Sequence, residues 1–138
     1  MIAKPKLTKN QSVVLKALTR AKKPLTAYEI LDLATVRTQG LKAPLTIYRA
    51  LDRLRDEGLV HRIESLNAFL ACCEKAGHTE PVGFVICDNC RKSVELRLSE
   101  CETHLGASAE AAGFQVGEIR VEMTGLCPAC VKAAARQG

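Results

Sequence analysis

Two short cysteine motifs, Cys87-Asp88-Asn89-Cys90 and Cys127-Pro128-Ala129-Cys130, decide how the C-terminal half of this chain folds. Residues 91–126 separate them, a longer loop than in the commonest zinc ribbons, so this loop must hold structure of its own. Zinc takes a tetrahedron of thiolates, and a two-residue gap lets one tight turn offer two sulfurs to the same ion. Each motif also sits at a predicted strand end or turn. We therefore predict that one structural zinc ion is bound by all four cysteines.

The alternatives to zinc are two disulfides, four unrelated buried thiols, or a redox motif. No thioredoxin-like βαβ pattern surrounds either pair, and the seven cysteines of the chain are an odd number that cannot pair fully. The first ten residues are basic and polar, unlike a signal peptide, and no run of about 18 apolar residues predicts a membrane span. We expect a cytoplasmic protein whose cysteines bind metal in a reducing compartment.

The net charge of +5 is unevenly distributed along the 138 residues. Residues 1–72 carry 13 Lys or Arg and 6 Asp or Glu, a balance of +7, whereas residues 73–138 carry 7 and 9, a balance of −2. A basic half joined to a slightly acidic half is typical of a nucleic-acid-binding module joined to a module with another role, although many basic faces are simply solvated.

The N-terminal half predicts three short helices followed by a β-hairpin. Thr8 with Gln11 and Thr26 with Glu29 form capping-box patterns that open the first two helices. Residues 36–43 are expected to be a loop. The third helix opens at Pro44, and its apolar stripe is formed by Ile47, Ala50, Leu51 and Leu54. Residues 59–64 and 68–72 are then expected to pair as strands around a turn at 65–67.

This order of elements is that of a winged helix-turn-helix, whose third helix lies in the major groove of DNA. The alternative is a small helical domain whose third helix has a solvated polar face. Tyr48 and Arg49 lie in the first turns of the third helix, where an arginine can pair with guanine and a tyrosine ring can pack on a thymine methyl. The basic residues that we expect to contact phosphates are Lys9, Lys16, Arg53 and Arg55.

The C-terminal half predicts a small α/β module. Strands are expected at 83–86, 93–98 and 114–124, a helix from 99 to 112 capped by Ser99, and a basic terminal helix at 131–136. The core of so short a segment is small, so zinc and dimerisation are expected to supply the missing stability. The fold class is therefore α+β, with a winged helix at 1–72, a hinge at 73–82 and a dimerisation and zinc-binding domain at 83–138.

A second group of metal-binding side chains surrounds the hinge: His61, Cys72, His78 and Glu95. Tetrahedral zinc accepts imidazole, thiolate and carboxylate together. A metal ion held by ligands from both halves and the linker would act as a switch. The alternatives are that the histidine is a hydrogen-bonded strand residue, that Glu95 is a surface carboxylate, or that the adjacent Cys73 replaces Cys72.

The chain resembles the ferric uptake regulator (Fur) family, most closely its zinc-sensing branch. The segments that carry the resemblance cover nearly the whole chain: Pro44-Leu45-Thr46-Ile47-Tyr48-Arg49-Ala50-Leu51, Glu57-Gly58-Leu59-Val60-His61-Arg62-Ile63-Glu64-Ser65-Leu66-Asn67, Phe84-Val85-Ile86-Cys87-Asp88-Asn89-Cys90 and Gly125-Leu126-Cys127-Pro128-Ala129-Cys130. The resemblance implies a homodimeric repressor with two zinc ions per subunit. The structural ion is held by the four cysteines of the paired motifs and the regulatory ion by His61, Cys72, His78 and Glu95.

The resemblance also implies that Tyr28, Tyr48 and Arg49 contact double-stranded DNA at an AT-rich palindromic operator upstream of zinc-uptake genes. The sequence contains no apparent catalytic nucleophile–base pair, so we do not expect an enzyme. We also expect no small-molecule substrate and no membrane partner. Cys101 and His104 share one face of the helix expected at 99–112. We interpret them as core or surface residues rather than as a third metal site. The rival interpretations are a Fur-family regulator that senses iron, manganese, nickel or peroxide, a thiol-disulfide oxidoreductase, and a zinc-stabilised adaptor that does not bind DNA.

Overall fold

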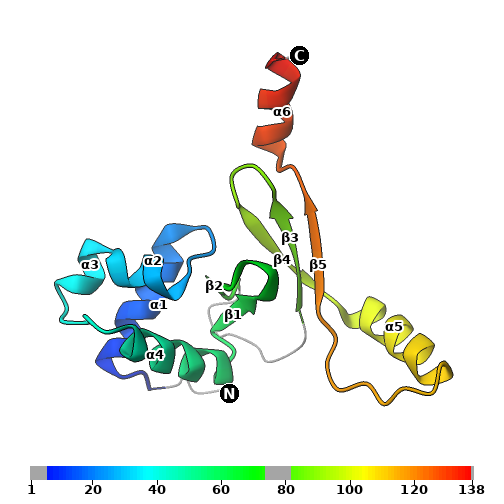
Figure 1. Cartoon of the computed structure of the whole chain (residues 1–138), viewed down its shortest axis with the longest axis horizontal. Coiled ribbons are helices and arrows are strands. Elements are labelled where there is room, and N and C mark those ends of the chain that lie inside the picture. Colours follow the sequence, from blue (N-terminus) through cyan, green and yellow to red (C-terminus); the bar gives the residue numbers. More distant parts are fainter. Residues whose placement is uncertain (1–5, 74–81, 138) are drawn as a thin grey trace. The chain divides into compact units, whose positions relative to one another are not determined.

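The computed structural model describes residues 6–73 and 82–137, which form helices and short strands (Figure 1). The chain divides into two compact units, Met1–Thr79 and Glu80–Gly138. Residues 74–81, most of the predicted hinge, lie outside the described residues, so the hinge stays a prediction. No helix among the described residues is both long and apolar enough to cross a membrane.

The first two helices begin at the predicted capping boxes. Helix α1 spans Lys9–Ala21, and its N-cap Thr8 accepts the Gln11 N–H at 3.2 Å while the Gln11 side chain accepts the Thr8 N–H at 3.1 Å. Helix α2 spans Ala27–Asp32, and Thr26 and Glu29 make the same reciprocal pair at 3.1 and 3.0 Å. Both predictions are confirmed, because each box satisfies two backbone N–H groups that the helix itself cannot bond.

A further short helix, α3 (Ala34–Arg37), occupies part of the region predicted to be a loop. The prediction for residues 36 and 37 is therefore wrong. Val36 is fully buried in the core, and this anchoring favours one helical turn where the local sequence carries no capping signal. The helix predicted as the third is consequently α4, the fourth helix of the structure.

Helix α4 spans Pro44–Asp56 and packs its apolar stripe into the core of the first unit. Proline at the first helical position suits the helix start, because its missing N–H has no intrahelical partner there in any case. The four stripe residues are at most 4% exposed: Ile47, Ala50, Leu51 and Leu54. They join buried residues of α1, α2 and the hairpin in one cluster, so the outward face of α4 is held rigidly.

The predicted hairpin is present and forms the wing. Strand β1 (Val60–Ile63) pairs antiparallel with β2 (Ala68–Ala71), and the short 3-10 helix η1 (Glu64–Leu66) makes the turn. Leu25, between α1 and α2, bonds Phe69 through both backbone groups, at 3.0 and 2.7 Å. The wing is thereby joined to the helices, which confirms the winged helix-turn-helix part of the fold class.

The second unit is built on a three-stranded sheet in the order β4-β3-β5 (Figure 1). The strands are β3 (Val82–Cys87), β4 (Ser93–Arg97) and β5 (Val121–Gly125). Helix α5 (Ser99–Ala111) follows β4, and helix α6 (Pro128–Gln137) follows β5. The mixed sheet with two helices confirms the predicted α/β class of this half.

Several boundaries in the second unit differ from the predictions, and three of these differences have a clear physical reason. Leu98, not Ser99, is the N-cap of α5, so the predicted capping box is wrong and the tertiary position of buried Leu98 sets the helix start. The predicted strand at 114–124 begins only at Val121, because pairing with β3 starts there. Helix α6 begins three residues early, at Pro128, a residue whose fixed φ suits the first helical position.

Candidate metal centre and nucleic-acid interface

The sheet of the second unit brings the two cysteine motifs to one edge. Strands β3 and β5 are parallel, with Cys87 opposite Gly125. A parallel pair needs a long crossover connection, and residues 91–126 supply it with β4 and α5. Because both strands end at the same edge, the turn after β3 and the start of α6 lie side by side. The long spacing between the motifs is thereby explained.

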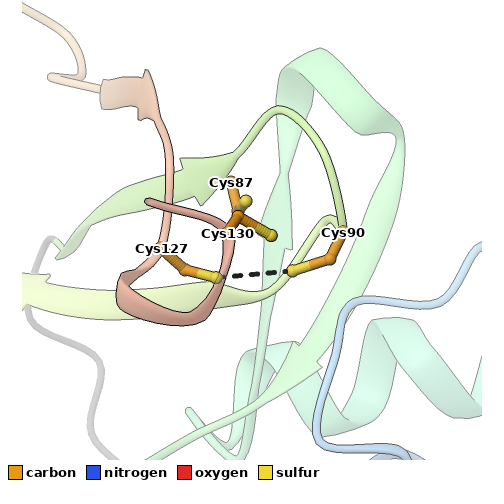
Figure 2. A group of neighbouring side chains, drawn as sticks. All are labelled: Cys87, Cys90, Cys127 and Cys130. Atoms are coloured by element: carbon orange, nitrogen blue, oxygen red, sulfur yellow. Dashed lines mark hydrogen bonds between the residues drawn. The ribbon is translucent and has the colours of Figure 1, made fainter. Parts of the chain in front are cut away.

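The four cysteines converge at this edge, as Figure 2 shows. One ligand sulfur from each of Cys87, Cys90, Cys127 and Cys130 lies within 4.8 Å of the other three. Cys87 is buried at the strand end, Cys90 is exposed on the turn, and the other two are half-buried at the start of α6. The Sγ atoms of Cys90 and Cys127 are 3.7 Å apart, too far for a disulfide bond.

The backbone around Cys87 holds the first motif in a tight turn. The Cys87 N–H bonds the Lys92 carbonyl at 2.9 Å, and the Arg91 N–H bonds the Cys87 carbonyl at 2.9 Å. Arg91 takes a φ of 67°, in the left-handed region, which lets the chain reverse directly after Cys90. The Asp88 N–H bonds the Gly125 carbonyl at 2.8 Å and ties this turn to the second motif.

Hydrogen bonds favour the thiolate form at Cys87 and Cys127, whereas hydrogen bonds with the other cysteines favour the thiol form at Cys130. Backbone N–H groups of Cys90 and then Cys127 lower the pKa of Cys87 to about 6. The Cys130 N–H likewise lowers the pKa of Cys127. The Asn89 amide, which donates to the Cys130 sulfur at 3.3 Å, lowers the pKa of Cys130, but Cys127 and Cys87 outweigh it and raise that pKa to about 11.

This donor set fits a zinc ion. Four sulfurs about 2.3 Å from a tetrahedral zinc lie about 3.8 Å from one another, close to the 3.7 Å between Cys90 and Cys127. A divalent cation would also lower the raised pKa of Cys130, because a positive charge stabilises all four thiolates together. Asn89 was not predicted as part of the site, and only its contact with Cys130 reveals its role.

The residues predicted to bind the regulatory ion are distributed over both units. His61 lies on β1 and Cys72 directly follows β2, and both are half-buried. Glu95 lies on β4 opposite Phe84, and His78 lies outside the described residues. Cys101 and His104 are both exposed on α5, as expected for surface residues.

The residues predicted to contact bases lie on two helices of the first unit. Tyr28 is in the first turn of α2 and is 61% exposed. Arg49 is exposed on the outward face of α4, whereas Tyr48 is half-buried and packs partly against the core. The Tyr48 ring is therefore held more rigidly than the Arg49 side chain.

The residues predicted to contact phosphates occupy two surfaces. Arg53 and Arg55 are exposed on α4, where Arg53 also pairs with Glu57 at 2.8 Å. Lys9 and Lys16 line a groove of about 390 Å³ between α1 and residues 35–39. Arg20 lines the same groove but was not among the residues predicted to contact phosphates. Its spacing from Lys16 could have indicated it, because Arg20 lies one helical turn further along the same face. None of the described residues that line this groove is acidic.

Comparison with known proteins identifies the family. The profile of the ferric uptake regulator family matches residues 3–124. The chain belongs to this family. It is 33% identical over 130 residues to the zinc uptake regulation protein of Escherichia coli K12. This alignment covers 94% of this chain and 75% of that protein. The predicted family resemblance is therefore confirmed.

Solved structures of Fur-family proteins match the fold. A zinc uptake regulator complexed with zinc and DNA aligns with a TM-score of 0.86 at 32% identity, covering 94% of this chain and 86% of that one. The holo form of XcZur aligns with a TM-score of 0.80 at 41% identity, covering 92% of this chain and 87% of that one. These relatives are zinc uptake regulators, and the family is one of regulators rather than enzymes.

Proposed function

We propose that this chain is a zinc-responsive transcriptional repressor that binds operator DNA as a homodimer and controls zinc-uptake genes. The observation that carries the proposal is the similarity, along almost the whole chain, to a zinc uptake regulator solved with zinc and DNA. The winged helix of the first unit and the four-cysteine cluster of the second supply the parts that such a function needs.

The four-cysteine cluster holds the structural zinc in this proposal. The described buried apolar residues of the second unit are few, namely Phe84, Ile86, Cys87 and Leu98. A core this small gives little stability to a short chain. An ion that joins the end of β3 to the start of α6 stabilises the sheet edge, since binding energy at such a site is folding energy.

The regulatory zinc is proposed to bind His61, Cys72, His78 and Glu95. The geometry of the hairpin supports two of these ligands, His61 and Cys72. His61 is opposite Leu70 in the strand pairing, and the Cys72 N–H donates to the Leu59 carbonyl at 2.8 Å, which continues the antiparallel pairing beyond β2. Residues 70 and 72 share one face of the strand, so Cys72 and His61 share that face as well. Their ligand atoms lie within 4.8 Å of each other.

Neighbouring Cys73 suits the regulatory site less well than Cys72. Successive residues of a strand point to opposite faces, and Cys73 is exposed. A thiolate ligand also favours zinc over ferrous iron, because it is a softer donor than carboxylate. An ion bound by ligands from both units and from the segment between them would lower the free energy of one arrangement of the winged helices, and so act as the switch.

Helix α4 is proposed to read the operator. Arg49 reaches a guanine and Tyr48 a thymine methyl in the major groove, while Tyr28 contacts the adjacent DNA. Arg53 and Arg55, together with Lys9 and Lys16 in their cationic groove, hold phosphates and set the orientation of the unit. The operator is proposed to be an AT-rich palindrome.

The second unit is proposed to form the dimer. Every side chain of α5 from 101 to 111 is exposed or half-exposed, which leaves the helix without a packed face in one subunit. Large apolar side chains of this unit are also exposed: Leu105 at 42%, Met123 at 47% and Phe114 at 70%. A second copy that covers them would place two α4 helices on the two halves of a palindrome.

Two adjacent cysteines offer a matched test of the proposal. DNA binding is measured by fluorescence anisotropy against buffered free zinc and, separately, ferrous iron, for the wild type, Cys72→Ser and Cys73→Ser. We expect zinc-dependent binding by the wild type and by Cys73→Ser. Cys72→Ser should remain a folded dimer whose DNA binding is weak and insensitive to zinc.

Three results would contradict different parts of the proposal. A response to ferrous iron alone refutes zinc as the signal. Equal zinc responses of Cys72→Ser and the wild type refute the ligand set. If no variant binds any duplex with the steep salt dependence that counterion release causes, the repressor function itself is refuted.

A further inference from the structure

One large apolar side chain on the outward face of α4 is mostly exposed in the first unit and lies outside its buried core. Leu45 is 57% exposed, and among the described residues of this unit only Tyr28 is a comparably exposed large apolar side chain. Single exposed leucines are common on protein surfaces and need no explanation by themselves. The position of Leu45 on α4 makes this one informative.

Leu45 is the second residue of α4 and lies at the centre of its outward face. At 100° per residue, Tyr48 and Arg49 fall on either side of it, and the buried stripe that contains Ile47 lies on the opposite side. The first turn, from Pro44 to Ile47, carries no charged side chain. In helix-turn-helix proteins, the N-terminal residues of the recognition helix are the ones that contact base edges.

The major groove offers one apolar group to such a side chain. The C5-methyl of thymine is the apolar feature of the groove edge, and guanine, adenine and cytosine have no equivalent there. We propose that Leu45 packs on a thymine methyl in each half-site and so specifies thymine next to the base contacted by Arg49. This inference rests on the proposed reading of DNA by α4 and adds a specificity-determining residue to it.

Removal of the methyl group from the DNA tests the contact directly. The probe is a duplex that the zinc-loaded wild-type protein selects from a randomised library, with each symmetric pair of thymines replaced in turn by deoxyuridine. Burial of one methyl group corresponds to about fourfold in affinity, so two half-sites give roughly fifteenfold. Because Tyr48 is also proposed to contact a thymine methyl, we expect sensitivity to uracil at two symmetric thymine pairs for the wild type. Leu45→Ala should lose the difference between thymine and uracil at one of these pairs and keep it at the other.

Two further variants make the result specific. Leu45→Met keeps a long apolar side chain and should retain the sensitivity to uracil. Arg53→Gln, a phosphate-contact variant, should weaken binding to the thymine and uracil duplexes by the same factor and so preserve their ratio. Because Leu45 is mostly exposed, Leu45→Ala should melt within a few degrees of the wild type, which circular dichroism checks.

The outcomes separate this inference from the proposed function. If the wild type selects no duplex, the DNA-reading function fails. If it selects one but no thymine pair is sensitive to uracil, or if Leu45→Ala keeps the wild-type sensitivity at every thymine pair, the inference about Leu45 is overturned while DNA reading stands. The second of these results would leave Tyr48 as the residue of α4 that contacts thymine methyl groups.

Discussion

Substitution of Cys90 by serine tests whether the four-cysteine cluster is a structural zinc site. Cys90 is the exposed member of the cluster, so its sulfur contributes little packing, and any loss of stability reports on the ion. A structural zinc contributes about 10 to 16 kcal/mol at neutral pH. If each of the four thiolates contributes one quarter of this free energy, loss of one thiolate weakens zinc binding roughly 10²- to 10³-fold.

The assay is competition for zinc against a chelator of known affinity, combined with thermal unfolding of the loaded protein. Cys101→Ser is the matched control, because Cys101 is also an exposed cysteine of the second unit but lies outside the cluster. Cys90→Ser should release the structural zinc at a chelator concentration 10²- to 10³-fold lower than the control does and should melt earlier. Equal zinc retention by the two variants would refute the assignment of the cluster.

Three further predictions concern stability. Gly83→Ala should destabilise the second unit by about 1 to 3 kcal/mol in urea unfolding, because the new Cβ would lie 2.9 Å from Leu98 Cδ2 and 3.2 Å from the Val121 carbonyl oxygen. Gly106→Ala is the control, because a Cβ added at Gly106 meets no atom within 4 Å. Thr26→Ala should cost about 1 kcal/mol in unfolding of the first unit, through loss of the bond to the Glu29 N–H, and Thr26→Ser should restore most of it. The metal-free protein should be most stable near pH 9. The pKa of Cys87 is lowered from 9.0 to about 6, so stability is lost as pH falls from 9 through 6, and the pKa of Cys130 is raised to about 11, so stability is lost as pH rises from 9 through 11. Urea unfolding from pH 6 to 10 measures this curve. Cys87→Ser should have a shallower rising limb, because Cys127, whose pKa is also lowered, still contributes to it.

Features with short-range causes could be predicted from the sequence. The capping boxes at Thr8 and Thr26 each act within four residues, and both are present. The stripe that begins at Ile47 repeats with the helical period, so the buried face of α4 followed from spacing alone. The wing followed from two apolar runs around a turn.

Features with long-range causes could not be predicted. Nothing near Val36 in the sequence signals helix α3, which exists because that side chain is buried against the other helices. The N-cap of α5 at Leu98 and the late start of β5 at Val121 depend on packing and on pairing with β3. Local propensity is a weak guide wherever tertiary contacts decide the outcome.

The candidate metal centre shows the same division. Two Cys-x-x-Cys motifs predict four thiolates and the ion that they favour, because ligand type and turn length are properties of a few adjacent residues. That the motifs meet at one sheet edge depends on the parallel pairing of β3 with β5, which joins residues about forty positions apart. The sequence by itself thus determined which atoms can bind the metal. Only the tertiary structure decided that they meet and that Asn89 contacts one of them, because strand register and direction are set by contacts across the whole unit.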